Sequence, residues 1–161
     1  MSPRKHNFSA GPAALPLPVL ERVRDELLDF RGTGMSLIEQ SHRDKPYEAV
    51  HAEAEADLRK LLGIPADYAV IFMGGGARTH FAMLPMNLLA PGQHADYVLT
   101  GLWAETAFKE AKKLGDARSV WSSAGSKYDH VPPAGDLHVS HDAAYLHTCS
   151  NNTVYGFRGV Q

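Results

Sequence analysis

The stretch Phe72-Met73-Gly74-Gly75-Gly76-Ala77-Arg78-Thr79 decides the fold, because three glycines join an apolar run to a helical pattern. The run over 68–73 is short and bounded by turn residues, which predicts a buried strand. A helix is expected from Arg78 to Leu89, with Pro85 bending it or fixing its first turn. The glycine turn therefore links a predicted strand to a predicted helix.

The alternation of helices and strands continues on both sides of this turn. Residues 1–18 are expected to form an extended arm, followed by helices over 18–30 and 46–61. The remaining expected elements are a helix over 103–114 and strands over 95–100, 118–121, 137–140 and 144–148. Strands that alternate with helices predict an α/β fold with a mainly parallel sheet and flanking helices.

Composition excludes several classes of protein. The chain has 161 residues, 44% of them hydrophobic, and a formal net charge of -2, so it lacks the basic excess of a nucleic-acid binder. A single cysteine, Cys149, excludes an internal disulfide framework and a cysteine-rich zinc site. The sequence shows no signal peptide and no apolar run near the roughly 20 residues of a membrane helix. A cytoplasmic protein that binds neither membrane nor nucleic acid is expected.

The glycine turn is a candidate phosphate site. Backbone N–H groups in the first turn of a helix lack partners inside the helix, and the helix dipole favours an anion there. Arg78 would add positive charge and Thr79 a hydroxyl group. The turn lacks the lysine of a Walker motif and the Gly-x-Gly-x-x-Gly spacing. A tight strand-to-helix turn without a ligand is the alternative.

Three further residues outside the glycine turn are candidates for binding a ligand. Trp103, after a predicted strand, could lay its face on a flat heteroaromatic ring or pack in the core. Arg43 could pair with a carboxylate or phosphate, or be a solvated loop residue. Thr153 follows a strand end, where ligands often bind in α/β sheets, although an Asx-type turn also fits. A metal site on the neighbouring histidines is disfavoured, because no known ligand spacing fits His138, His141 and His147.

Taken in order along the chain, these motifs resemble those of the phosphoserine aminotransferases. The resemblance covers nearly the whole chain and is weakest over 116–136. The stretches that carry it include Asn7-Phe8-Ser9-Ala10-Gly11-Pro12-Ala13, residues 32–36 followed by Ser41-His42-Arg43, residues 75–88 from the glycine turn onward, residues 95–98 with Gly101-Leu102-Trp103, residues 109–113, and residues 143–147 leading to Asn151-Asn152-Thr153.

The resemblance implies the large domain of a fold-type-I aminotransferase that uses pyridoxal 5'-phosphate (PLP) and is usually a homodimer. Such enzymes move an amino group from L-glutamate to 3-phosphohydroxypyruvate, which gives O-phospho-L-serine and 2-oxoglutarate for serine biosynthesis, and in many bacteria they also serve pyridoxine biosynthesis. The alternatives are another PLP aminotransferase of this fold, such as an alanine–glyoxylate type, and a non-catalytic domain that binds a phosphate-bearing ligand.

Residue roles carry over from the matching motifs. Ala77 and Arg78 would hold the cofactor phosphate through backbone N–H groups, Trp103 would stack on the pyridine ring, and Thr153 would hydrogen-bond the cofactor. Arg43 would bind the substrate carboxylate and His42 would help with the substrate phosphate.

Three features of the chain depart from the family pattern. The phosphate-loop residues 77–79 differ from those of commoner members, a change that a backbone contact tolerates. Ala10 stands where many members have serine. No catalytic residue is expected within the chain, since the family's Schiff-base lysine would lie beyond Gln161. The chain is therefore expected to be an incomplete N-terminal part of the large domain, without the small domain and inactive alone.

Overall fold

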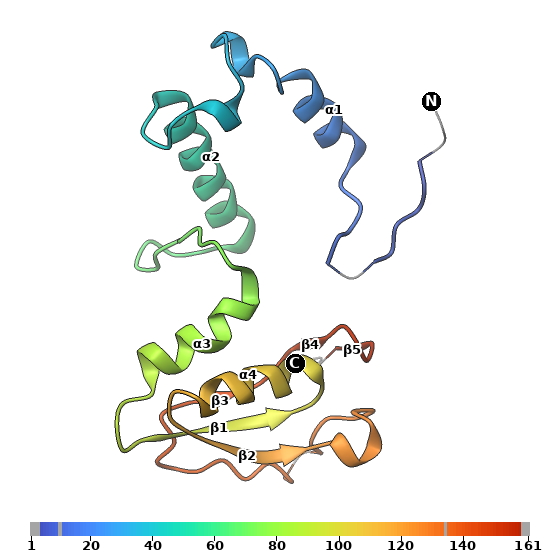
Figure 1. Cartoon of the computed structure of the whole chain (residues 1–161), viewed down its shortest axis with the longest axis vertical. Helices are drawn as coiled ribbons and strands as arrows, with labels where there is room; N and C mark the ends of the chain where they lie inside the picture. The colour runs from blue at the N-terminus through green and yellow to red at the C-terminus, as the bar shows by residue number, and fades with distance from the viewer. Residues whose placement is uncertain (1–3, 10, 134, 159–161) are drawn as a thin grey trace. The chain divides into compact units, whose positions relative to one another are not determined.

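The computed structural model describes residues 4–9, 11–133 and 135–158, and it divides into two compact units, Met1–Phe72 and Met73–Gln161 (Figure 1). The strands of the described residues all belong to the second unit. Ala10, which departs from the family pattern, lies outside the described residues.

The first unit is helical. Its elements are α1 (Leu17–Asp25), η1 (Phe30–Gly32), η2 (Leu37–Glu39) and α2 (Lys45–Leu62). Both predicted α-helices are present, although α1 ends before the expected Phe30, which instead begins η1. Gly63 ends α2 in the left-handed conformation, with φ of 64°, which glycine adopts without a steric penalty. Neither α1 nor α2 contains a buried residue.

The predicted strand over 68–73 is wrong. These residues form a turn followed by an irregular stretch, and Ile71 is 72% exposed. A buried strand needs neighbours that satisfy its backbone groups, and among the described residues none pairs with this segment. Its contacts are instead to α2: the guanidinium group of Arg59 donates hydrogen bonds to the carbonyl oxygens of Pro65 (3.2 Å) and Tyr68 (3.0 Å).

The second unit contains the parallel sheet. Strands β1 (His94–Leu99), β2 (Asp116–Ser122) and β3 (Leu146–His147) are parallel in the order β2-β1-β3. The β1–β2 register shifts between Tyr97 and Val98, which is a local bulge. Two further short strands, β4 (Asn151–Asn152) and β5 (Phe157–Arg158), pair antiparallel. The α/β prediction with a mainly parallel sheet is confirmed.

Two of the short strand predictions need correction. Residues 137–140 form no strand, and within 144–148 only Leu146 and His147 do. Ser140 shows the reason, because its backbone N–H donates to a side-chain carboxylate, Oδ2 of Asp96 (2.7 Å), rather than to a neighbouring strand. The Ser140 N–H is thus satisfied without a partner strand.

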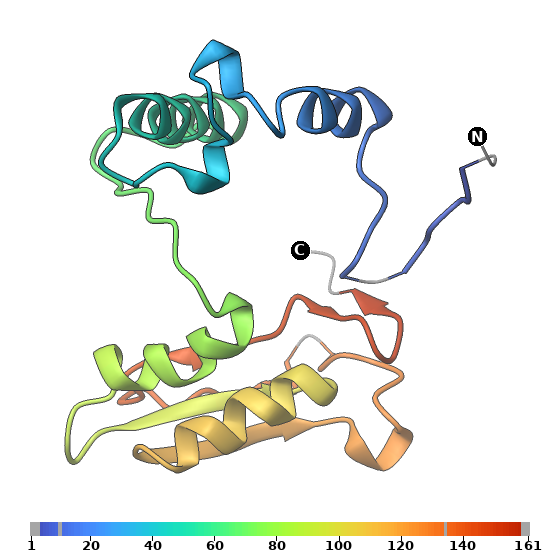
Figure 2. The same cartoon turned by 45° about the horizontal axis from the view of Figure 1, so that its top comes forward.

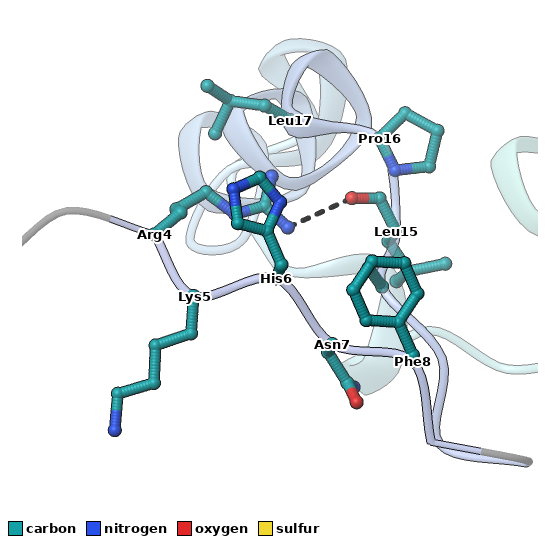
Figure 3. A pocket seen from close by; sticks show the side chains of 9 residues that line it. Arg4, Lys5, His6, Asn7, Phe8, Leu15, Pro16 and Leu17 are labelled. Atoms are coloured by element: carbon teal, nitrogen blue, oxygen red, sulfur yellow. Dashed lines mark hydrogen bonds between the residues drawn. The ribbon is translucent and has the colours of Figure 1, made fainter.

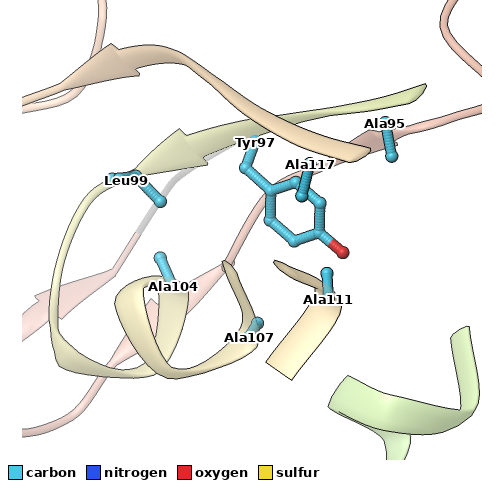
Figure 4. Close-up of a cluster of buried hydrophobic side chains, with 7 residues drawn as sticks. All are labelled: Ala95, Tyr97, Leu99, Ala104, Ala107, Ala111 and Ala117. Carbon is cyan, nitrogen blue, oxygen red and sulfur yellow. The ribbon is translucent and has the colours of Figure 1, made fainter. Parts of the chain in front are cut away.

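Helix α3 (Gly76–Leu88) packs beside α4 (Leu102–Lys112), and α4 packs on β1 and β2 (Figures 1 and 2). The core cluster between α4 and the sheet is built mostly of alanines, shown in Figure 4: Ala95, Tyr97, Leu99, Ala104, Ala107, Ala111 and Ala117. Phe81 of α3 packs against this cluster. Pro85 lies inside α3 and is buried, so it does not fix the first turn of the helix.

No helix in the described part of the chain is both long and apolar enough to span a lipid bilayer.

Candidate functional site

The glycine turn forms an open helix N-terminus. Gly75 is the N-cap of α3 with φ of 94°, and Gly76 follows with φ of 62°, conformations that favour glycine. No side chain in the described residues caps this helix, and residues 74–80 are exposed. The first amides of α3, those of Gly76, Ala77 and Arg78, therefore face solvent and can receive an anion.

Thr79 does not contribute a free donor to this site. Its hydroxyl group donates to the carbonyl oxygen of Gly75 (Oγ1 to O, 3.0 Å), so the proton is already used. The sequence pattern alone suggested that this hydroxyl group was available to a ligand. In the structure it closes the turn, and only its lone pairs remain free to accept.

Trp103 and Thr153 lie together in the second unit. Nε1 of the Trp103 indole donates to Oγ1 of Thr153 at 2.9 Å, although the residues are 50 positions apart. Trp103 belongs to the first turn of α4 and is half-buried, while Thr153 is exposed in the turn that follows β4. The fold thus brings two predicted cofactor residues side by side near the C-terminal end of β1. Trp103 supplies an aromatic ring and Thr153 a hydroxyl group.

Sequence reasoning gave Asn152 no role in the site: it was a turn-forming neighbour of Thr153 and a member of one stretch that carries the resemblance. It is fully buried, and its Nδ2 donates to Oγ1 of Thr100 at 3.0 Å. Gly101 packs against the same amide: a Cβ at this position would lie 2.5 Å from Cγ of Asn152. A buried amide next to a turn carries no distinctive sequence pattern, because asparagine is common in exposed turns.

A second set of contacts joins the loop after β2 to the same region. The hydroxyl group of Tyr128 donates to Oε1 of Glu105 in α4 (2.9 Å), and its ring lies 5.0 Å from that of Tyr155 between centroids. Burial, and then the hydrogen bond with Glu105, raise the pKa of Tyr128 to about 12. Lys127 and Tyr128 both have φ of 61°, an uncommon backbone conformation for residues other than glycine.

Buried ionisable groups lie at the other end of β1. Asp96 is fully buried, and its Oδ1 is 3.8 Å from Nε2 of His94. The ring of His147 stacks on that of Tyr97, and burial lowers the pKa of His147. Among the described residues, no three His, Cys, Asp or Glu side chains are grouped so that they could hold a metal ion.

The predicted substrate residues belong to the first unit. His42 lines a small hollow together with Tyr47, Glu48 and His51. Arg43 is exposed, and its backbone N–H donates to Oγ of Ser41 (3.2 Å). Their proximity to the residues of the second unit stays a prediction.

Another hollow lies along the N-terminal arm (Figure 3). The guanidinium group of Arg4 crosses it and donates to the carbonyl oxygen of Leu15 (3.0 Å), and His6 and Phe8 stack with centroids 6.4 Å apart. None of the predicted site residues lines this hollow.

Comparison with known proteins gives a consistent result. The family model "Aminotransferase class-V" matches residues 5–160. The phosphoserine aminotransferase of Geobacillus kaustophilus is 52% identical over 153 residues, which are 95% of this chain and 42% of that protein. The chain therefore spans less than half the length of this relative.

Solved structures agree with the sequence relatives. The chain is similar to phosphoserine aminotransferase from Bacillus circulans subsp. alkalophilus, with a TM-score of 0.87 and 54% identity over 93% of this chain and 42% of that one. It is also similar to the PLP-bound enzyme from Trichomonas vaginalis, with a TM-score of 0.88 and 38% identity over 96% and 44% of the two chains. A family match over nearly the whole sequence, with this level of structural similarity, shows that the chain belongs to the class-V aminotransferases.

Proposed function

We propose that the protein is a phosphoserine transaminase that uses PLP to move an amino group between L-glutamate and 3-phosphohydroxypyruvate, with O-phospho-L-serine and 2-oxoglutarate as products. The proposal is supported by the names of its relatives, which are phosphoserine aminotransferases at about half identity. It places the protein in serine biosynthesis, with pyridoxine biosynthesis as a further role. A cytoplasmic homodimer is the expected form.

The observation that carries the proposal is the hydrogen bond between Trp103 and Thr153. An indole face and a fixed hydroxyl group at the C-terminal end of a parallel strand suit a flat polar ring. In the same unit, the uncapped N-terminus of α3 supplies amides for a phosphate group. Ring and phosphate are the two recognisable parts of PLP, and the residues present fit both.

The roles of these residues follow from their chemistry. Ala77 and Arg78 hold the phosphate through their backbone N–H groups, and the Arg78 guanidinium group adds positive charge. Trp103 would stack on the ring and exclude water from it, and its N–H, which donates to Oγ1 of Thr153, would hold that hydroxyl group in place for a hydrogen bond to the cofactor. PLP, when bound, supplies the electron sink that amino-group transfer requires.

Substrate recognition is assigned to the first unit. A guanidinium group matches a carboxylate with two parallel hydrogen bonds, so Arg43 would bind the substrate carboxylate. His42 would assist with the substrate phosphate. Among the described residues, no hydrogen bond or ion pair occupies the side chain of Arg43 or His42, and Arg43 bonds to Ser41 only through its backbone N–H.

The experiment is a transamination assay of the native, full-length protein with L-glutamate and 3-phosphohydroxypyruvate. Pyruvate and glyoxylate serve as alternative acceptors. We expect activity with the phosphorylated acceptor and much less with the others. Trp103→Phe keeps a ring face but removes the donor to Thr153, which should weaken PLP binding by about threefold to tenfold, the equivalent of one net hydrogen bond. A preference for glyoxylate would instead favour the alanine–glyoxylate class.

A further inference from the structure

Asn152 occupies a buried position between three elements of the second unit. Its side chain is fully buried, and Nδ2 donates to Oγ1 of Thr100, which is itself only 4% exposed. Thr100 directly follows β1, while Asn152 belongs to β4, so this bond joins two segments that are 52 residues apart. A buried hydrogen bond of this kind fixes the spacing of the segments that carry it.

Gly101 completes the contact from the other side. Its φ of 155° favours glycine, and a Cβ there would lie 2.6 Å from Oδ1 and 2.7 Å from Cβ of Asn152. The backbone at the N-cap of α4 therefore rests directly on the Asn152 side chain. Asn152 both tethers Thr100 and limits how closely α4 approaches β4.

The same two segments carry the exposed pair of the site. Trp103 follows Gly101 by two residues, and Thr153 follows Asn152 directly. Their hydrogen bond of 2.9 Å lies at the surface, where water competes for both groups. The buried bond is shielded from that competition, so it is the stronger constraint on the distance between α4 and the Thr153 turn.

We propose that Asn152 is a positioning residue of the cofactor site, which acts by setting the indole of Trp103 and the hydroxyl group of Thr153 at the correct separation. This inference rests on the proposed function. In this proposal Asn152 contacts neither cofactor nor substrate. It affects the positions of Trp103 and Thr153 through its contacts with Thr100 and Gly101. Its Oδ1 has no hydrogen-bond partner among the described residues, and an unsatisfied buried atom of this kind calls for an explanation such as a functional role.

The test uses the PLP-free form of the native, full-length protein, titrated with PLP. Affinity is read from absorbance, and ring orientation from the visible circular dichroism that bound PLP acquires. Thr100→Val removes the acceptor at constant shape, Thr100→Ser keeps the hydroxyl group, and Asn152→Ala removes the amide. Thr106→Val is the matched control, because within the described part of the chain the Thr106 hydroxyl group bonds only to the carbonyl oxygen of Leu102 in α4 (2.8 Å).

We expect Thr100→Val and Asn152→Ala to weaken PLP binding by about tenfold to a hundredfold, by analogy with the loss seen when the hydrogen-bond partner of a metal-ligating residue is removed. Both should reduce the visible dichroism, the double variant should be no worse than the more affected single variant, and Thr100→Ser and Thr106→Val should behave as the unaltered protein does.

Unchanged affinity and dichroism in folded Thr100→Val would overturn the inference while leaving the proposed function intact. An equally large effect of Thr106→Val would also overturn the inference, because it would indicate that any substitution in this region loosens the packing of α4. If the unaltered protein does not bind PLP, the proposed function fails, and the inference fails with it.

Discussion

Replacement of Gly101 with alanine should destabilise the protein through two separate effects. The first is backbone strain, because a φ of 155° is unfavourable for any residue with a Cβ and such conformations cost of order 1–3 kcal/mol. The second is steric, since the new Cβ would lie 2.5 Å from Cγ of Asn152. Asn152 must then move, and leaving the buried Thr100 without its partner costs about 1–3 kcal/mol. Together they predict a loss of about 2–6 kcal/mol.

A matched glycine separates the two effects. Gly92 also has a positive φ, 83°, but a Cβ there would meet no atom within 4 Å. Gly92→Ala should therefore cost only the strain, about 1–2 kcal/mol. The assay is equilibrium urea unfolding of the native, full-length protein, followed by far-ultraviolet circular dichroism. Equal losses for both variants would refute the reasoning, because the contact with Asn152 would then contribute nothing.

Three further predictions concern substrate binding and pH. Arg43→Ala should raise the KM for glutamate or phosphoserine by roughly tenfold to a hundredfold, the cost of a charge-assisted hydrogen bond, and unchanged values for both substrates would exclude the role. Because the pKa of Tyr128 is raised to about 12, the unfolded chain loses this proton first, near its ordinary pKa of about 10. Stability in urea should therefore fall between these two pH values, and less steeply in Tyr128→Phe; equal slopes would contradict this. Because burial lowers the pKa of His147, the unfolded chain gains a proton first as the pH falls below about 6.5. Stability should decline there, and His147→Phe, which keeps the stack on Tyr97, should flatten the decline in urea titrations; an unchanged decline would contradict it.

The sequence was informative where a pattern is local. Helical spacing located α2 and α4 to within a few residues, and the apolar run at Ala95 located β1. It failed at 68–73, where the run is more apolar than β1 but has no paired neighbour among the described residues. Pairing is a long-range property, so composition within one short window cannot distinguish a paired strand from an unpaired stretch.

The candidate site likewise has parts that the local sequence predicts and parts that depend on tertiary packing. The glycine turn is one continuous motif, so its conformation follows from local chemistry. The residues Trp103 and Thr153 were singled out separately, and only the resemblance joined them before the fold did. Asn152 had no signal of its own, since its importance comes from burial against Thr100, which depends on tertiary packing.

The alanines of α4 limit what protein engineering can change in this region. Ala104, Ala107 and Ala111 are all completely buried against the sheet (Figure 4). Any larger side chain there would push the helix outward, because a close-packed interface has no room for added methylene groups. Such a shift would carry Trp103 away from Thr153 without altering either residue. Libraries that aim to change substrate preference should therefore leave these three positions unvaried and place their diversity on the exposed face of the helix.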